Sequence, residues 1–162
     1  MLVDGYDNTI SNMRIASVKI GVKLNVGGNY LSNIHPLFVY GGEASYEGSI
    51  AFWDAGKNQF HSCYSDQFET GFRVHYGSIY NMCTCFWYTD RGSLQRGFWE
   101  EGQLNCSIIN CKVSFNFTTV KCVFIQIDYA GGNGVIEYPW FNVEKNSDDS
   151  YLPHLIGKVL PY

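Results

Sequence analysis

The sequence has few charged residues and no long apolar segment. Only 16% of its 162 residues are Asp, Glu, Lys or Arg, whereas 17% are aromatic. Disordered chains show the opposite balance, so the composition predicts a folded globular protein. A membrane-spanning helix needs roughly 20 consecutive apolar residues, and no such run occurs. The length suits one domain, residues 1–162, that is large enough to bury a core.

Clusters of basic residues are also missing. Lys and Arg total 11 against 15 Asp and Glu, which gives a formal net charge of −4 and a pI near 5.5. Proteins that bind nucleic acids usually carry a basic face, so we expect no nucleic-acid partner. The opening residues 1–7 are acidic and contain few apolar residues, which argues against a secretory leader.

The usual catalytic and cofactor motifs are absent as well. There is no Gly-x-Ser-x-Gly, His-Glu-x-x-His, Gly-Lys-Ser/Thr or strand-to-helix Gly-x-Gly-x-x-Gly. We therefore expect a non-enzymatic protein without a cofactor. The enzymatic alternative is a hydrolase with Cys63 as nucleophile and His61 as base, because residues two apart in a strand share a face. Glu100 and Glu101 are adjacent, would point to opposite faces and could not flank one bond.

Six cysteines are present, and we expect most of them to be reduced. They are Cys63, Cys83, Cys85, Cys106, Cys111 and Cys122. Free cysteine is a good small core residue, and Cys83 and Cys85 would share a strand face without being able to bond each other. The cysteine spacings do not match paired zinc knuckles and the histidines are scattered, so no metal site is expected. Three disulfides remain the alternative.

Apolar residues recur at every second position along most of the chain. The clearest example runs from Val18 to Val26, which indicates a strand with one solvated face. Further strand-like segments cover residues 37–40, 49–53, 59–64, 71–76, 80–88, 112–117, 120–129 and 135–143. Turns rich in Gly, Asn and Asp separate them. This spacing predicts a mainly β protein, an antiparallel β-sandwich or barrel, and no internal repeat is evident.

Helix is expected in two places at most. Seventeen glycines and many β-branched or aromatic residues oppose it. Residues 8–17 could form a short helix with Ser11 as the N-cap, and residues 150–160 could form another between Pro153 and Pro161.

A polar and aromatic segment, residues 86–101, is the candidate binding site. It has the pattern of two strand ends joined by a polar loop, and its candidate ligand-binding residues are Trp87, Tyr88, Asp90, Arg91, Arg96 and Trp99. Such rings suit a sugar, because a ring covers the apolar C–H face while Asp or Arg bonds the hydroxyls. Trp and Tyr at a loop rim equally suit a membrane surface. A packed hairpin with its rings in the core is the third alternative.

The opening Leu2-Val3-Asp4-Gly5-Tyr6 resembles the start of the receptor-binding heads of rotavirus spike proteins. The chain length and the abundance of Asn, Ile and Tyr with little Ala are also similar to those heads. This resemblance implies the head of a divergent rotavirus group, on the outer capsid of the virion. It further implies attachment to host cell-surface glycans without catalysis, as part of a larger multivalent assembly.

A second set of short matches resembles the aegerolysins, small acidic β-sandwiches that bind membrane lipids. The matching positions are Tyr46-Glu47-Gly48, Asp54, Cys63, Thr70-Gly71-Phe72, Phe86-Trp87-Tyr88, Gly92-Ser93 and Trp99. This resemblance implies binding to sphingolipid membranes, recruitment of a pore-forming partner, and a protein that is cytoplasmic or secreted without a signal peptide. The family's Cys-Pro-Trp is replaced here by Thr89-Asp90-Arg91, which removes an exposed Trp.

Overall fold

A computed structural model of the chain describes residues 1–16, 18–39, 46–88, 93–115, 122–143 and 154–156, and its regular elements there are all strands. They are β1 (Leu2–Val3), β2 (Thr9–Ala16), β3 (Ile20–Leu24), β4 (Tyr30–Leu37), β5 (Ile50–Trp53), β6 (Gln59–His61), β7 (Tyr64–Asp66), β8 (Thr70–Arg73), β9 (Ile79–Asn81), β10 (Thr84–Trp87), β11 (Gln95–Glu100), β12 (Ser107–Ile109), β13 (Lys112–Phe115), β14 (Cys122–Ile127), β15 (Val135–Glu137), β16 (Trp140–Val143) and β17 (His154–Ile156).

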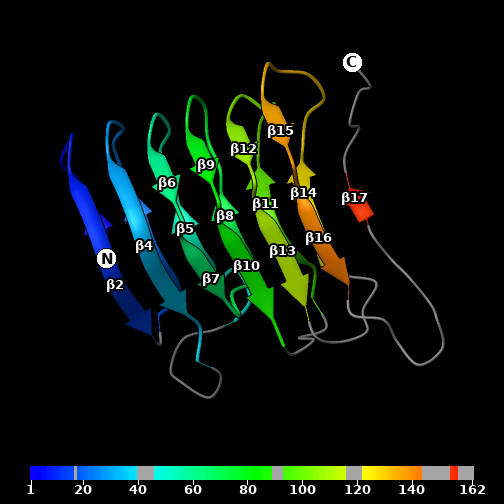
Figure 1. Cartoon of the computed structure of the whole chain (residues 1–162), viewed down its shortest axis with the longest axis horizontal. Coiled ribbons are helices and arrows are strands. Elements are labelled where there is room, and N and C mark those ends of the chain that lie inside the picture. The colour runs from blue at the N-terminus through cyan, green and yellow to red at the C-terminus, as the bar shows by residue number, and fades with distance from the viewer. Residues whose placement is uncertain (17, 40–45, 89–92, 116–121, 144–153, 157–162) are drawn as a thin grey trace.

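The described strands form two sheets in which every pairing is parallel. Sheet A has the order β1-β3-β5-β8-β11-β14-β17. Sheet B has the order β15-β12-β9-β6-β4-β7-β10-β13-β16, and β2 pairs with β4. The strands of sheet B run in front in Figure 1, and those of sheet A run behind them in the opposite direction.

The chain therefore winds as a parallel β-solenoid whose two sheets curl around one core. Each coil passes through sheet A, turns a corner into sheet B and returns, so that β1–β2 form the first coil, β3–β4 the second, β5–β7 the third, β8–β10 the fourth and β11–β13 the fifth. The expected antiparallel sandwich or barrel is wrong, because each strand pairs with its equivalent one coil later and not with its neighbour in sequence.

Both helix expectations also need correction where the structure describes them. Residues 9–16 form strand β2, and residues 154–156 form strand β17. The rest of the segment 150–160 lies outside the described residues. No helix occurs within the described chain. Residues 9–16 instead pair with β4 in the parallel sheet.

Polar side chains, half-buried in the first coil and buried in the next three, fix the corner at which sheet A turns into sheet B. Asn8, Asn29, Asn58 and Ser78 occupy equivalent places in four coils, separated by 21, 29 and 20 residues. Oδ1 of Asn58 accepts the backbone N–H of Asn29 at 2.9 Å, and Nδ2 of Asn58 donates to Oδ1 of Asp54 at 2.6 Å. This polar ladder satisfies backbone groups that water cannot reach.

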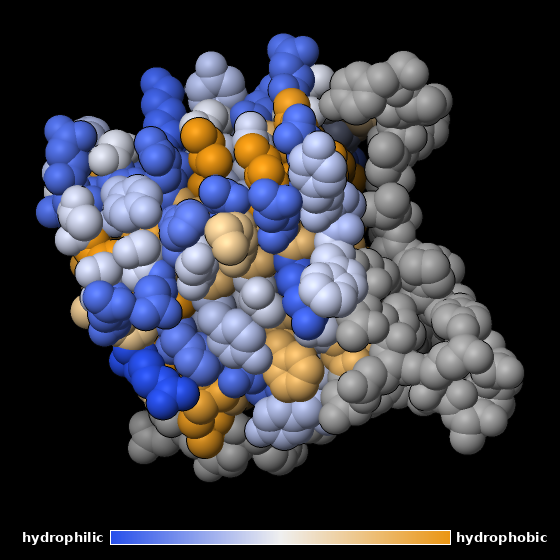
Figure 2. Space-filling view, viewed as in Figure 1, coloured by the Kyte–Doolittle hydropathy of each residue, from blue (hydrophilic) through white to orange (hydrophobic). Residues whose placement is uncertain are grey.

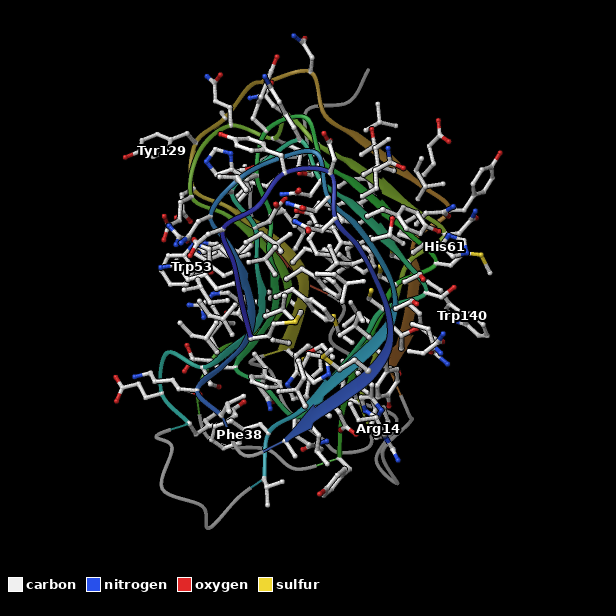
Figure 3. All side chains as sticks on the ribbon, turned by 90° about the vertical axis from the view of Figure 1, so that its left-hand side faces the viewer. Arg14, Phe38, Trp53, His61, Tyr129 and Trp140 are labelled. Carbon is white, nitrogen blue, oxygen red and sulfur yellow. The ribbon has the colours of Figure 1, made fainter. Side chains whose placement is uncertain are left out.

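A residue in the left-handed conformation interrupts sheet B at the same place in each coil. These residues, with φ between 50° and 56°, are Asn12, Asn33, Ser62, Met82, Asn110 and Tyr138. The kink changes the side of the sheet on which the next side chain lies. His61 therefore points outward (Figure 3), whereas Cys63, on the other side of Ser62, is fully buried. The expectation that Cys63 and His61 share a face is wrong for this reason.

The space between the sheets is filled by stacked rings and free thiols. Phe72 lies parallel to Phe52 at a centroid distance of 4.5 Å and close to parallel with Phe98 at 5.2 Å. Phe60 and Tyr80 of sheet B stack at 4.9 Å. All six cysteines are buried without disulfides, as we expected for core thiols.

Candidate functional site

The predicted aromatic hairpin does not form. β10, which ends at Trp87, belongs to sheet B, and β11 belongs to sheet A, so the two strands do not pair. Trp87 is only 1% exposed, and its Nε1 donates to the carbonyl oxygen of Phe68. The expectation that its ring faces a ligand is wrong, since the ring is part of the core. Tyr88 is exposed, and Asp90 and Arg91 lie outside the described residues.

Arg96 and Trp99 lie on the outer face of sheet A, where their polar groups are already bonded. Arg96 donates from Nε to Oε1 of Gln126 at 2.6 Å and from Nη1 to Oε1 of Glu69 at 3.1 Å. Nε1 of Trp99 donates to Oδ2 of Asp128 at 3.1 Å. These hydrogen bonds tie both side chains to neighbouring side chains on sheet A. Few of their donors are left to bond a sugar.

Cations cover the ring faces on this side of sheet A. Lys23, Trp53, Arg73 and Trp99 follow one another in register on successive strands. Nζ of Lys23 lies 4.9 Å and Cζ of Arg73 lies 4.0 Å from the ring centroid of Trp53. Cζ of Arg73 is also 5.8 Å from the Trp99 ring, and Cζ of Arg96 is 5.2 Å from it. We interpret the row as a stabilising cation–π ladder.

A groove lies at the corner between the sheets. The turns that form this corner lie along the upper edge of the molecule in Figure 1. The groove has two adjoining parts of about 450 and 300 Å³, which share His75 and Tyr76. The first part also involves Tyr6, Asn25, Gly28, Gly56 and Lys57. The second part also involves Arg73, Glu100, Glu101, Gln103 and Asn105. We call the two parts together the corner groove.

Glycines form the floor of the first part. Gly28 and Gly56 have φ values of 79° and 98°, and a Cβ on Gly56 would lie 2.7 Å from the carbonyl oxygen of Tyr76. The N–H of Gly28 donates to the carbonyl of Lys57 at 2.8 Å, and the N–H of Lys57 donates to the carbonyl of Tyr76 at 2.9 Å. The missing Cβ atoms thus let successive turns stack closely, and these turns line the first part of the groove with small residues.

Two exposed tyrosines border this floor. The side chains of Tyr6 and Tyr76 are 71% and 59% exposed, and neither hydroxyl makes a hydrogen bond within the part of the chain that the structure describes. Nδ1 of His75 accepts the backbone N–H of Tyr76 at 2.8 Å, which assigns the proton of the neutral ring to Nε2. Lys57 is exposed beside them and forms no ion pair with another described residue.

A buried carboxyl group lies behind the second part. Glu100 is 6% exposed, and its Oε1 accepts the N–H of Gly102 at 3.1 Å. Its Oε2 is buried without a partner among the described residues. Burial raises the pKa of Glu100 above the usual value, although the bond from Gly102 opposes that shift. Glu101 is exposed and pairs with Arg73, whereas Glu100 is buried.

Two further absences apply to the described residues only. No three His, Cys, Asp or Glu side chains there are grouped so that they could hold a metal ion. No helix there has the length and apolar character needed to cross a membrane.

No motif in the sequence pointed to the groove residues Tyr6, Lys57, His75 and Tyr76. Each lies within two residues of a polar or glycine-rich turn, and the turns recur as Asp7-Asn8, Gly28-Asn29, Lys57-Asn58 and Gly77-Ser78. Alignment of these turns with one another would have placed the four side chains along a single corner.

Comparison with known proteins gives no match: no family model, curated protein or solved structure is similar to this chain. The resemblances to rotavirus heads and to aegerolysins are neither supported nor opposed by this result. The function has to be argued from the geometry of the corner groove.

Proposed function

We propose that this protein is a non-enzymatic recognition module that binds a glycan along the corner groove. The observation that carries the proposal is a floor of small residues bordered by the exposed rings of Tyr6 and Tyr76. A tyrosine ring can cover the apolar C–H face of a sugar. Lys57 and Nε2 of His75 are donors without partners in the described structure, and they can bond its oxygen atoms.

The direction of the groove favours an extended glycan chain over a single terminal sugar. Tyr6 belongs to the first coil, Tyr76 to the fourth and Asn105 to the fifth. Neighbouring strands in a sheet are about 4.8 Å apart, so four steps from Tyr6 to Asn105 extend over about 19 Å. A monosaccharide could occupy one part of the groove, whereas an oligosaccharide could contact both parts across Tyr76.

The membrane-binding alternative has less support from the described surface. Figure 2 shows the outer face of sheet B as largely hydrophilic, with hydrophobic residues scattered over it. The rings of Trp53 and Trp99 on the face of sheet A are covered by cations. A lipid-binding protein would instead be expected to present uncovered apolar rings together.

The biological setting in this proposal is attachment to host cell-surface glycans by an outer-capsid protein. This part comes from the resemblance of Leu2-Val3-Asp4-Gly5-Tyr6 to rotavirus heads. Single sugar contacts are weak, and affinities in the range of roughly millimolar to micromolar are expected for an isolated module. Display in a multivalent assembly would then raise the avidity.

A glycan array tests the proposal when it is probed with three proteins of equal melting temperature. They are the wild type, Tyr76→Ala and the control Tyr129→Ala, whose ring is 66% exposed but does not line the groove. We expect the wild type and Tyr129→Ala to bind the same glycans, and Tyr76→Ala to lose them. Absence of any signal from the wild type would refute glycan binding. Co-sedimentation with sphingolipid vesicles would then favour the lipid alternative.

A further inference from the structure

The N-terminal end of the solenoid is open among the residues that the structure describes. β2 pairs with β4 along one edge, and no described segment covers its other edge, which faces the viewer in Figure 3. Residues 11–14 of β2 are all exposed. An uncovered edge strand presents unpaired N–H and C=O groups, and the terminal coils of repeat proteins therefore need a cap.

The core and the polar ladder are also incomplete at this end. Ile10 and Ile15 pack against the core but are only partly buried, whereas Leu31, the partner of Ile10 in β4, is completely buried. Nδ2 of Asn33 donates to Oδ1 of Asn12 at 2.7 Å. Nδ2 of Asn12 itself has only a 3.5 Å contact with Oγ of Ser11. Both the apolar and the polar layers could thus be continued by one more strand.

We propose that a second copy of this chain covers the open end by antiparallel pairing of β2 with β2. The two-fold axis passes between Asn12 and Met13. Ile10 then lies opposite Ile15 of the second copy, and by symmetry this apolar pair occurs twice. Residues directly opposite each other in an antiparallel pair share a face, so both isoleucine pairs extend the core.

The β2 sequence is self-complementary in this register and loses that property in adjacent registers. Ser11 lies opposite Arg14 of the second copy, on the outer side. A shift of one residue in either direction would place Ile10 opposite Arg14 or Ala16, both of which are exposed, and would remove the pairing of the two core-facing isoleucines. The left-handed Asn12 divides β2, and each half pairs with the other half of the second copy. A two-fold contact of this kind is closed and stops at two chains.

Matched charge variants at Ser11 test this register, with mass measured by sedimentation across a range of concentrations. We expect the wild type to form a dimer of the 18.4 kDa chain that dissociates on dilution. Ser11→Arg places like charges opposite each other at two points, and we expect it to raise the dissociation constant at least tenfold. Ser11→Glu pairs with Arg14 and should strengthen the dimer, more so at low salt.

Ser32 provides the control, because it lies next to Ser11 in register but one coil inside the stack. Ser32→Arg and Ser32→Glu should leave the dissociation constant within about twofold of the wild-type value. Melting temperatures of all four variants identify any that fail to fold. Ser11 is exposed, so its substitution should leave the monomer folded.

Disulfide cross-linking gives a second readout that does not depend on charge. The double variant Ser11→Cys/Arg14→Cys should form an intermolecular disulfide with oxidised glutathione, whereas each single variant should not. The native cysteines are buried. A monomer at every concentration would overturn the proposal, as would equal effects of the two Ser11 variants. Masses beyond a dimer would indicate open-ended stacking and would also overturn it.

Discussion

The hydroxyl of Tyr80 donates a hydrogen bond to Oδ2 of Asp54 across the interior, and so joins sheet B to the corner of sheet A. Both residues are buried. Tyr80→Phe would leave Oδ2 of Asp54 without a donor, and we expect it to lower the free energy of unfolding by about 1–3 kcal/mol. Urea denaturation measures this change, and an unaltered midpoint would show that the bond contributes little.

The same bond predicts a dependence on alkaline pH. Burial, followed by the charge of Asp54, raises the pKa of Tyr80 well above its usual value. A raised pKa in the folded state adds stability that is complete below the unfolded pKa of about 10 and is lost as the pH rises through the folded pKa. We therefore expect wild-type stability to fall more steeply above about pH 10 than that of Tyr80→Phe.

Asn58 and Asn33 allow a buried position in a polar ladder to be compared with an exposed one. Asn58 is buried, and its Nδ2 donates to Oδ1 of Asp54 at 2.6 Å and to the carbonyl of Gly56 at 3.1 Å. Asn58→Ala leaves several buried groups unpaired and should cost at least about 2 kcal/mol. Asn33 is exposed and bonds Asn12 at the surface, so Asn33→Gly, which tolerates the left-handed backbone at φ 51°, should cost less than about 1 kcal/mol. Similar losses in thermal denaturation would contradict the assigned role of the buried ladder.

At Gly71 the backbone of sheet A lies very close to a side chain of sheet B. A Cβ there would lie 2.3 Å from Sγ of Cys85 and 2.7 Å from the carbonyl oxygen of Gly97. Gly71→Ala should therefore cost about 1–3 kcal/mol or more. Gly102→Ala is the control, since its nearest neighbour would be Oε1 of Glu100 at 3.4 Å. If both variants have the melting temperature of the wild type, the described spacing between the sheets is incorrect.

Glu100 should make the protein relatively less stable as the pH rises from acid to neutral. Burial raises its folded pKa, so its contribution is complete below the unfolded pKa of about 4.3 and is lost as the pH rises through the folded value. We expect Glu100→Gln to melt at or above the wild-type temperature at pH 7, with the difference vanishing below about pH 4. Glu101→Gln, which loses the pair with Arg73, should show no such gain.

The positions of many strands could be predicted from the sequence, but their pairing could not. Alternation at 120–129 correctly indicated β14, yet a period of two fits parallel and antiparallel sheets equally well. Turns rich in Gly and Asn are typical of antiparallel sheets, but here they form the corners of a solenoid. Coil lengths of 21, 29, 20 and 28 residues conceal the repeat, because no single period aligns the coils.

Left-handed residues explain two of the wrong local predictions. Asn12 shifts the alternation within β2, so that Ile10 and Ile15 both pack against the core although they are five residues apart in an extended segment. Ser62 separates the faces of His61 and Cys63 in the same way. Trp87 is buried on the face that it shares with Cys85, whereas Phe86 is partly exposed. Both are large aromatic residues, so the sequence does not show which of them faces the core.

The binding of oligosaccharides of increasing length tests the proposed function most directly. For a glycan recognised on the array, calorimetric titration of wild-type protein should show affinity rising until the chain extends over both parts of the corner groove. Tyr6→Ala, altered at one end of the groove, should bind short chains like the wild type and lose the gain from long ones. Equal affinity for a monosaccharide and a long chain, with no effect of Tyr6→Ala, would contradict binding along the groove.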